Sequence, residues 1–176
     1  EEGAGIVLQV CSAVTNLRPG DRVAMSFGSC GHCRLCHEGA PAYCEHGHHL
    51  QFGGARDDGS TTLRDARGAP VHGSFFQQSS FATHALGTAR SVVKLPDDVP
   101  LELAGPLGCG IQTGAGAVLN TLDVRAGASI AIFGVGTVGL AAVMAAKIAG
   151  CTTIIAVDID TARLSLAAEL GATQVI

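Results

Sequence analysis

Apolar positions follow a different pattern in the two parts of this chain. In the first part they form short runs broken by turn signals such as Pro19-Gly20-Asp21, a pattern typical of short strands. Segments rich in glycine, cysteine and polar residues separate these runs and predict loops. The expected strands cover residues 6–10, 22–25 and 80–93, and the expected loops cover residues 28–50 and 53–73. The first part is therefore predicted to be β-rich.

The last part alternates apolar strands with helices. Leu101 to Leu122 carries apolar residues at helical spacing, and Gly150 and Gly171 each follow a predicted helix as a stop signal. The expected order is strand 129–133, helix 137–149, strand 152–157, helix 161–170 and a third strand from 174. Strands that are apolar throughout and alternate with helices indicate a parallel, doubly wound sheet. We therefore expect an α/β protein with two domains, 1–99 and 100–176.

Composition indicates a globular protein and excludes some partners. Of 176 residues, 47% are hydrophobic and 15% charged, which is not the balance of a disordered chain. The net charge of −4 offers no basic surface for nucleic acid or anionic lipid. We see neither a signal peptide nor an apolar run near the ~20 residues that span a bilayer, so we expect a cytoplasmic protein with no membrane partner.

Four of the seven cysteines are gathered in fifteen residues. Cys30, Cys33, Cys36 and Cys44 are separated by two, two and seven residues. Closely spaced cysteines on a turning loop can supply the four thiolates of a tetrahedral zinc site, and four protein ligands leave no open position for substrate. We therefore predict a structural zinc. An iron–sulfur cluster is the rival, although its usual run has three residues before a final Cys-Pro, and disulfides or free thiols also remain.

Five histidines lie near these cysteines. With four thiolates present they are surplus to a zinc shell, and we expect exposed loop residues. They are His32, His37, His46, His48 and His49.

A glycine-rich turn follows the strand that ends at Phe133. The sequence Gly134-Val-Gly136-Thr-Val-Gly139 opens a helix, and Asp158 ends the next strand nineteen residues later. This arrangement predicts a dinucleotide site, with the pyrophosphate at the helix N-terminus and the carboxylate on the ribose hydroxyls. Asp158 would repel the 2′-phosphate of NADP, so NAD is the expected cofactor. Alternatively, the glycines serve helix packing and Asp158 starts a helix.

Together, in this order, the cysteine loop and the dinucleotide turn resemble the zinc-dependent medium-chain alcohol dehydrogenases. The resemblance runs over nearly all 176 residues and includes the segment from Val14 to Val23. The segments HGSFFQQSSFATHA and LGCGIQTGAGAVLN are more similar to the aryl (benzyl) alcohol branch than to the polyol branch. The resemblance implies a GroES-like β-barrel domain followed by a Rossmann domain, in a chain that lacks both ends of the complete enzyme.

The resemblance also implies the functional residues. A second, catalytic zinc would be held by a cysteine, a histidine and a further cysteine that matches Cys109, which the residues alone predict to be an inert buried thiol. Glu2 and Gly5 match the end of the family motif Gly-His-Glu-x-x-Gly, so Glu1 stands where the histidine belongs. Only one of the three zinc ligands is then present, which makes activity of this chain alone doubtful. The expected cofactor-binding residues are Thr113, Gly134, Gly136, Thr137, Val138, Gly139, Asp158, Ile159 and Arg163.

The expected activity is hydride transfer between a primary alcohol, with an aromatic one favoured, and NAD, giving the aldehyde. Phe75, Phe76 and Phe81 are candidates for an apolar substrate pocket, although core packing is the safer assignment for each. The resemblance implies a small-molecule substrate and a homo-oligomer. Two alternatives remain: a non-catalytic, zinc-stabilised nucleotide-binding remnant, and another medium-chain dehydrogenase acting on polyols or on glutathione-bound formaldehyde.

Overall fold

The computed structural model describes residues 2–176 and divides the chain into two compact units after Gly108. The segment just before this division holds two 3-10 turns, η2 (Leu101–Leu103) and η3 (Gly105–Gly108). Between them lies the fully buried Ala104, which packs with Ala24 and Leu95. Residues 100–108 therefore lie in the first unit by contact, although the sequence pattern changes at about residue 100.

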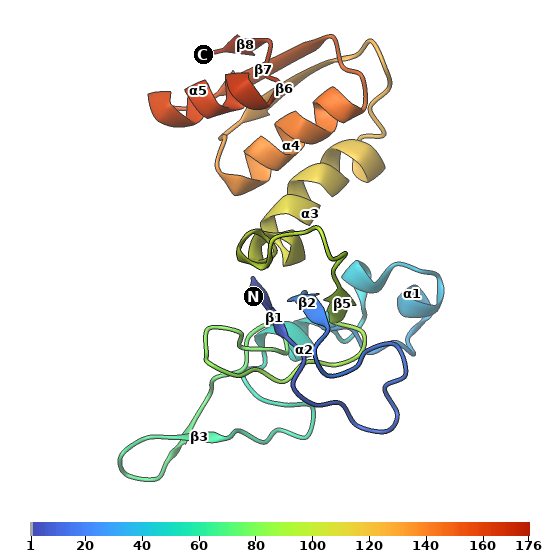
Figure 1. The fold of residues 1–176 in the computed structure, drawn as a ribbon, viewed down its shortest axis with the longest axis vertical. Coiled ribbons are helices and arrows are strands. Elements are labelled where there is room, and N and C mark those ends of the chain that lie inside the picture. Colours follow the sequence, from blue (N-terminus) through green and yellow to red (C-terminus); the bar gives the residue numbers. More distant parts are fainter. Residues whose placement is uncertain (1) are drawn as a thin grey trace. The chain divides into compact units, whose positions relative to one another are not determined.

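The first unit contains a three-stranded antiparallel sheet of β1 (Gly3–Ile6), β2 (Arg22–Met25) and β5 (Val92–Lys94), with β2 in the centre (Figure 1). Val23, Ala24 and Met25 of the central strand are all buried, which is why this run could be predicted from sequence. The expected mixed α/β architecture is confirmed, but residues 2–108 form no closed barrel.

Two predicted strands differ from the structure. The strand expected at residues 6–10 ends at Ile6, and that expected at 80–93 is reduced to Val92–Lys94. The alternating pattern shows that a segment can line one face of a sheet, but a strand also needs a partner for its backbone groups. Within the described part of the chain, residues 81–90 have no strand beside them, and all are exposed.

The predicted loops contain short ordered elements. In residues 28–52 lie α1 (Arg34–His37), the 3-10 turn η1 (Pro41–Tyr43) and α2 (Gly47–Phe52). Beyond them, β3 (Leu63–Arg64) and β4 (Pro70–Val71) form an exposed two-stranded hairpin. The hairpin agrees with the polar, exposed connection expected there.

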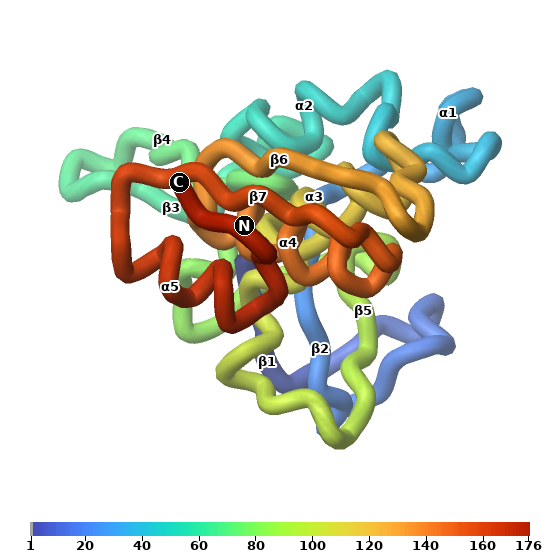
Figure 2. Tube along the Cα trace, turned by 90° about the horizontal axis from the view of Figure 1, so that it is seen from above, coloured from blue at the N-terminus to red at the C-terminus, as the bar shows by residue number. Residues whose placement is uncertain are grey.

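The second unit has the predicted strand–helix order. α3 (Gly110–Gly116) continues into a π-helical turn, η4 (Ala117–Thr121), and then come β6 (Ser129–Phe133), α4 (Thr137–Ile148), β7 (Thr153–Val157), α5 (Thr161–Leu170) and β8 (Gln174–Val175). The three strands are parallel in the order β6-β7-β8, and Figure 2 shows β6 and β7 side by side with the C-terminal end next to β7.

The core of the second unit lies between this sheet and its helices. Val135, Val143 and Ile154 are almost completely buried, and each such side chain contributes about 1.5–3 kcal/mol by leaving water. β6 is less buried than its apolar sequence predicts: Ile132 is buried, but Phe133 is 80% exposed. No helix within residues 2–176 combines the length and the apolar character needed to cross a membrane.

Candidate metal and cofactor sites

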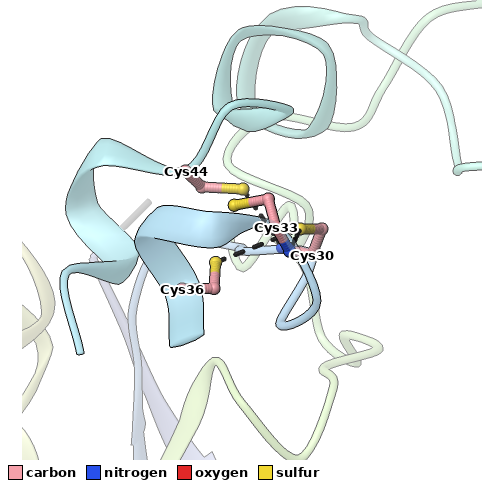
Figure 3. A group of neighbouring side chains, drawn as sticks. All are labelled: Cys30, Cys33, Cys36 and Cys44. Carbon is pink, nitrogen blue, oxygen red and sulfur yellow. Dashed lines mark hydrogen bonds between the residues drawn. The ribbon is translucent and has the colours of Figure 1, made fainter. Parts of the chain in front are cut away.

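The four clustered cysteines point toward one another (Figure 3). The sulfur atoms of Cys30, Cys33, Cys36 and Cys44 all lie within 4.8 Å of one another, and Cys30 Sγ is 4.0 Å from Cys36 Sγ. Tetrahedral zinc with Zn–S bonds of about 2.3 Å needs sulfurs about 3.8 Å apart. Within residues 2–176 no cysteine forms a disulfide. The donor set and its spacing therefore fit a zinc ion that holds the loop together.

Local backbone structure explains this arrangement. α1 is a single turn that begins after Cys33 and includes Cys36, so two sulfurs are three residues apart on one helical turn. Backbone N–H groups point at sulfur: Cys30 N donates to Cys44 Sγ at 3.3 Å, and Cys33 N donates to Cys30 Sγ at 3.3 Å. Leu50 is also buried beside the cluster. The loop is thus ordered around its cysteines.

Two thiols of the cluster have pKa values shifted in opposite directions. Backbone N–H groups of Glu45 and Cys36 lower the pKa of Cys33 to about 6, while burial raises the pKa of Cys36 to about 11. Hydrogen bonds thus stabilise the thiolate of Cys33, whereas burial disfavours the charged form of Cys36. A metal cation is what allows several thiolates to share so small a volume.

All five nearby histidines are exposed, as expected. Two of them nevertheless lie beside the cluster: Cys30, His32 and His46 form a second set of metal-capable side chains. The sequence interpretation did not single out this pair. The only sequence signal is that each histidine is two residues from a clustered cysteine.

The glycine turn has the properties that a dinucleotide site requires. Gly134 has φ +83°, a left-handed conformation that favours glycine. A Cβ on Gly139 would lie 1.9 Å from Gly134 O, so only glycine allows α4 to start so close to the turn. A Cβ on Gly136, in contrast, would meet nothing within 4 Å. The backbone at Gly136 is therefore open to a ligand at the N-terminus of α4.

Asp158 faces the turn from the end of β7. Its Oδ2 accepts a hydrogen bond from Val135 N at 2.7 Å, and its Oδ1 accepts one from Asp160 N at 3.0 Å. The Val135 N–H in particular holds the pKa of this carboxyl below its ordinary value. Asp158 is therefore charged at neutral pH, with lone pairs left on both oxygens for ribose hydroxyls. These residues fit a dinucleotide.

The remaining predicted cofactor residues are mostly exposed. Thr137 and Val138 begin α4, and Ile159 follows Asp158 with a fully exposed side chain. Arg163 Nε lies 3.7 Å from Asp160 Oδ2, and Asp160 caps α5 by accepting from Ala162 N and Arg163 N. The capping role of Asp160 was not predicted.

Three predicted residues concern the catalytic zinc or the nicotinamide. Cys109 is half-buried and is the N-cap residue of α3, where its carbonyl accepts from Thr113 N at 2.9 Å. Thr113 is exposed on the same helix, and Glu2 is exposed before β1. Neither Cys109 nor Glu2 belongs to the four-cysteine cluster. Glu1, matched to the zinc-ligand histidine, lies outside the described residues.

Comparison with protein families gives two matches along the chain. Residues 1–97 match the alcohol dehydrogenase GroES-like domain, and residues 137–176 match the zinc-binding dehydrogenase domain. The first match covers the four-cysteine cluster, and the second begins within the glycine turn.

Individual relatives agree with these matches. Geraniol dehydrogenase of Castellaniella defragrans is 51% identical over 99% of the chain. An alcohol dehydrogenase zinc-binding domain protein of Burkholderia ambifaria is 59% identical with a TM-score of 0.94, and benzyl alcohol dehydrogenase of Acinetobacter calcoaceticus is 50% identical with a TM-score of 0.91, each over 99% of the chain. In each case the chain spans 47% of the length of its relative.

Proposed function

Since this chain belongs to the zinc-dependent medium-chain alcohol dehydrogenases, an oxidoreductase family, we propose that it takes part in the NAD-dependent oxidation of a primary aromatic alcohol to the aldehyde. One observation carries the proposal: Asp158 is anchored by Val135 N beside the open backbone of Gly136, in a chain that also holds a four-sulfur metal cluster. The domains we propose are a GroES-like domain, 1–99, and a Rossmann domain, 100–176.

The chemistry of this family is supplied by its two bound groups. A bound catalytic zinc would supply Lewis-acid activation of the alcohol oxygen, and a bound nicotinamide would supply the acceptor for the hydride from the alcohol carbon, with one proton released. The protein must then bind and orient the cofactor. We propose that Gly134, Gly136 and Gly139 contact the pyrophosphate and that Asp158 binds the ribose. Thr137, Ile159 and Arg163 are proposed near the adenosine half of the cofactor. Thr113 and Val138 are proposed at the nicotinamide.

Charge at Asp158 supports NAD over NADP. The carboxylate keeps its charge because hydrogen bonds from backbone N–H groups lower its pKa. An additional 2′-phosphate would be repelled at this position. Arg163 is the nearest basic residue in sequence, but its guanidinium is directed at Asp160.

An aromatic substrate is supported by the benzyl alcohol dehydrogenase neighbour and by a group of phenylalanines in the first unit. Phe52, Phe75 and Phe76 contact one another with ring centroids 4.8–5.8 Å apart, and Phe75 remains 47% exposed. Aromatic rings pair favourably with other aromatic rings in edge-to-face geometry. Phe81 is fully exposed, so the core packing expected for it is wrong. Geraniol is a primary allylic alcohol. The geraniol dehydrogenase relative therefore supports a wider proposed substrate class, the unsaturated primary alcohols.

Cys109 is proposed as a ligand of the catalytic zinc, and Glu2 is proposed separately as a catalytic residue, because each matches a family motif. Cys109 supplies a thiolate and Glu2 a carboxylate, both groups that bind zinc or tune its ligands. We further propose a cytoplasmic homo-oligomer.

The test is a comparison of kcat/KM for benzyl alcohol, geraniol, sorbitol and S-hydroxymethylglutathione with NAD, using the natural protein that carries these residues. We expect benzyl alcohol to be the best substrate, followed by geraniol. Preference for either of the last two would overturn the substrate assignment. NADH binding without turnover of any alcohol would favour the non-catalytic nucleotide-binding alternative.

A further inference from the structure

Two exposed histidines lie next to one sulfur of the four-cysteine cluster. The rings of His32 and His46 have centroids 5.5 Å apart and are tilted by 40°. One ring nitrogen of each histidine and Cys30 Sγ all lie within 4.8 Å of one another. Both histidines are exposed and Cys30 is half-buried, so a metal ion in solution can reach all three side chains.

The ring of His32 is held by the backbone of its own loop. Its Nδ1 lies 3.0 Å from the carbonyl oxygen of Cys30. In the tautomer that donates this hydrogen bond, Nδ1 carries the proton and Nε2 keeps its lone pair. Metal-binding histidines usually make this backbone contact, which fixes the tautomer and the direction of the ring.

The loop that holds the cysteines also holds these histidines. Gly31, with φ +77°, turns the chain between Cys30 and His32. His46 precedes α2 as its N-cap residue, and its carbonyl accepts from Leu50 N at 3.1 Å. Folding of the cysteine loop therefore brings the two imidazoles together.

We propose that Cys30, His32 and His46 form a second metal site, at the surface of the loop, for a divalent ion of the zinc and nickel class. Imidazole and thiolate are ligands that these ions prefer, whereas Mg²⁺ and Ca²⁺ select oxygen. A thiolate has several lone pairs, so Cys30 would be shared between the four-cysteine site and this surface site. Alcohol oxidation does not require this site, which stands independently of the proposed function.

Nickel binding to the zinc-loaded chain tests the proposal. Tag-free protein is titrated with NiCl₂ by calorimetry, and bound nickel and zinc are counted after desalting. We expect nickel to bind without loss of zinc, with a near-ultraviolet sulfur-to-nickel charge-transfer band. His32→Gln or His46→Gln is expected to raise the dissociation constant at least tenfold.

His37→Gln is the matched control, because His37 is an exposed histidine of the same loop outside the set. It is expected to leave the dissociation constant within twofold. An equal loss in all three variants would show non-specific histidine binding and overturn the site. If a variant loses its zinc, the wild-type spectrum still decides, because nickel binding without the sulfur band contradicts a Cys30 ligand.

Discussion

Asp158 and Val135 join the two parts of the proposed nucleotide site: the carboxylate at the end of β7 accepts a 2.7 Å hydrogen bond from the backbone N–H at the centre of the glycine turn. This bond crosses from one parallel strand to the turn after its neighbour. It holds the acidic side chain beside the N-terminus of α4 before any ligand binds. The turn and the acid, predicted from the sequence as one arrangement, are thus joined by a direct hydrogen bond.

Asp158→Asn should weaken NADH binding and reduce discrimination against NADPH. The amide keeps an acceptor for Val135 N but loses the negative charge. A hydrogen bond to a charged group contributes about 1.5–3 kcal/mol, so NADH affinity should fall by about ten- to a hundredfold. Fluorescence titration with both cofactors measures this. Glu169→Gln, an exposed charge removal on α5, should change neither affinity. An unchanged ratio of NADH to NADPH affinity in Asp158→Asn would contradict the assigned role.

Alanine substitutions at two glycines of the same turn should affect different properties, stability in one case and NADH binding in the other. At Gly139 the new Cβ meets Gly134 O at 1.9 Å, and such overpacking typically lowers the free energy of unfolding by about 1–3 kcal/mol. At Gly136 the Cβ meets no protein atom, so stability should be retained while NADH binding is lost. Thermal melts and NADH titrations of both variants separate these effects. Retained NADH affinity in a folded Gly136→Ala variant would argue against a ligand approaching there.

Cys44→Ser should remove about one zinc ion per chain, because it breaks a four-ligand shell. The melting temperature of the first unit should fall as well, since metal binding is coupled to folding of such a loop. Elemental analysis and thermal melts provide the readout. Cys11→Ser, at an exposed thiol outside the cluster, is the control and should keep the full zinc content. Equal zinc in both variants would rule out the cluster as the metal site.

Asp21→Asn should destabilise the first unit at neutral pH but not in acid. Lys94 Nζ lies 2.6 Å from Asp21 Oδ1, and this contact, followed by the backbone N–H of Arg18, lowers the pKa of Asp21 below its ordinary 3.8. A depressed folded-state pKa gives stability that is present above pH 3.8 and lost as the pH falls through the folded value.

The melting temperatures of wild type and Asp21→Asn should therefore differ at pH 7 and converge below pH 3.8. Melts from pH 7 to pH 3 measure the difference, and Asp98→Asn, at an exposed carboxylate, should follow wild type throughout. A gap that stays constant down to the lowest pH would show that the charge of Asp21 is not the cause.

The second unit could be predicted almost to the residue because its signals are local. Apolar runs fixed β6 and β7, and Gly150 and Gly171 marked the ends of α4 and α5. In the first unit the strand at Ser80–Val93 could not be judged from its own residues, since pairing depends on a neighbouring strand. Sequence patterns describe what a segment is able to do, whereas its partners are a tertiary property.

Among the site residues, too, local features could be predicted from the sequence and tertiary contacts could not. Cysteine spacing was enough to predict the four-sulfur cluster, and the strand–turn–helix order was enough to predict Asp158 at the end of the strand beside the glycine turn. Spacing did not reveal that His32 and His46, far apart in the loop, lie beside Cys30. It also did not reveal that Val135 N donates the hydrogen bond that holds the Asp158 side chain. Almost every residue has a backbone N–H, so residue type does not indicate which one acts as a donor.

The most direct test of the account is the formation of NADH from benzyl alcohol and NAD by the natural protein that carries these residues, beside its Cys109→Ser variant. The account predicts NADH formation that depends on the alcohol and is abolished by Cys109→Ser, while the zinc of the four-cysteine cluster is retained. Protein that binds NADH and zinc but oxidises no alcohol, or a Cys109→Ser variant that keeps the wild-type rate, would contradict it.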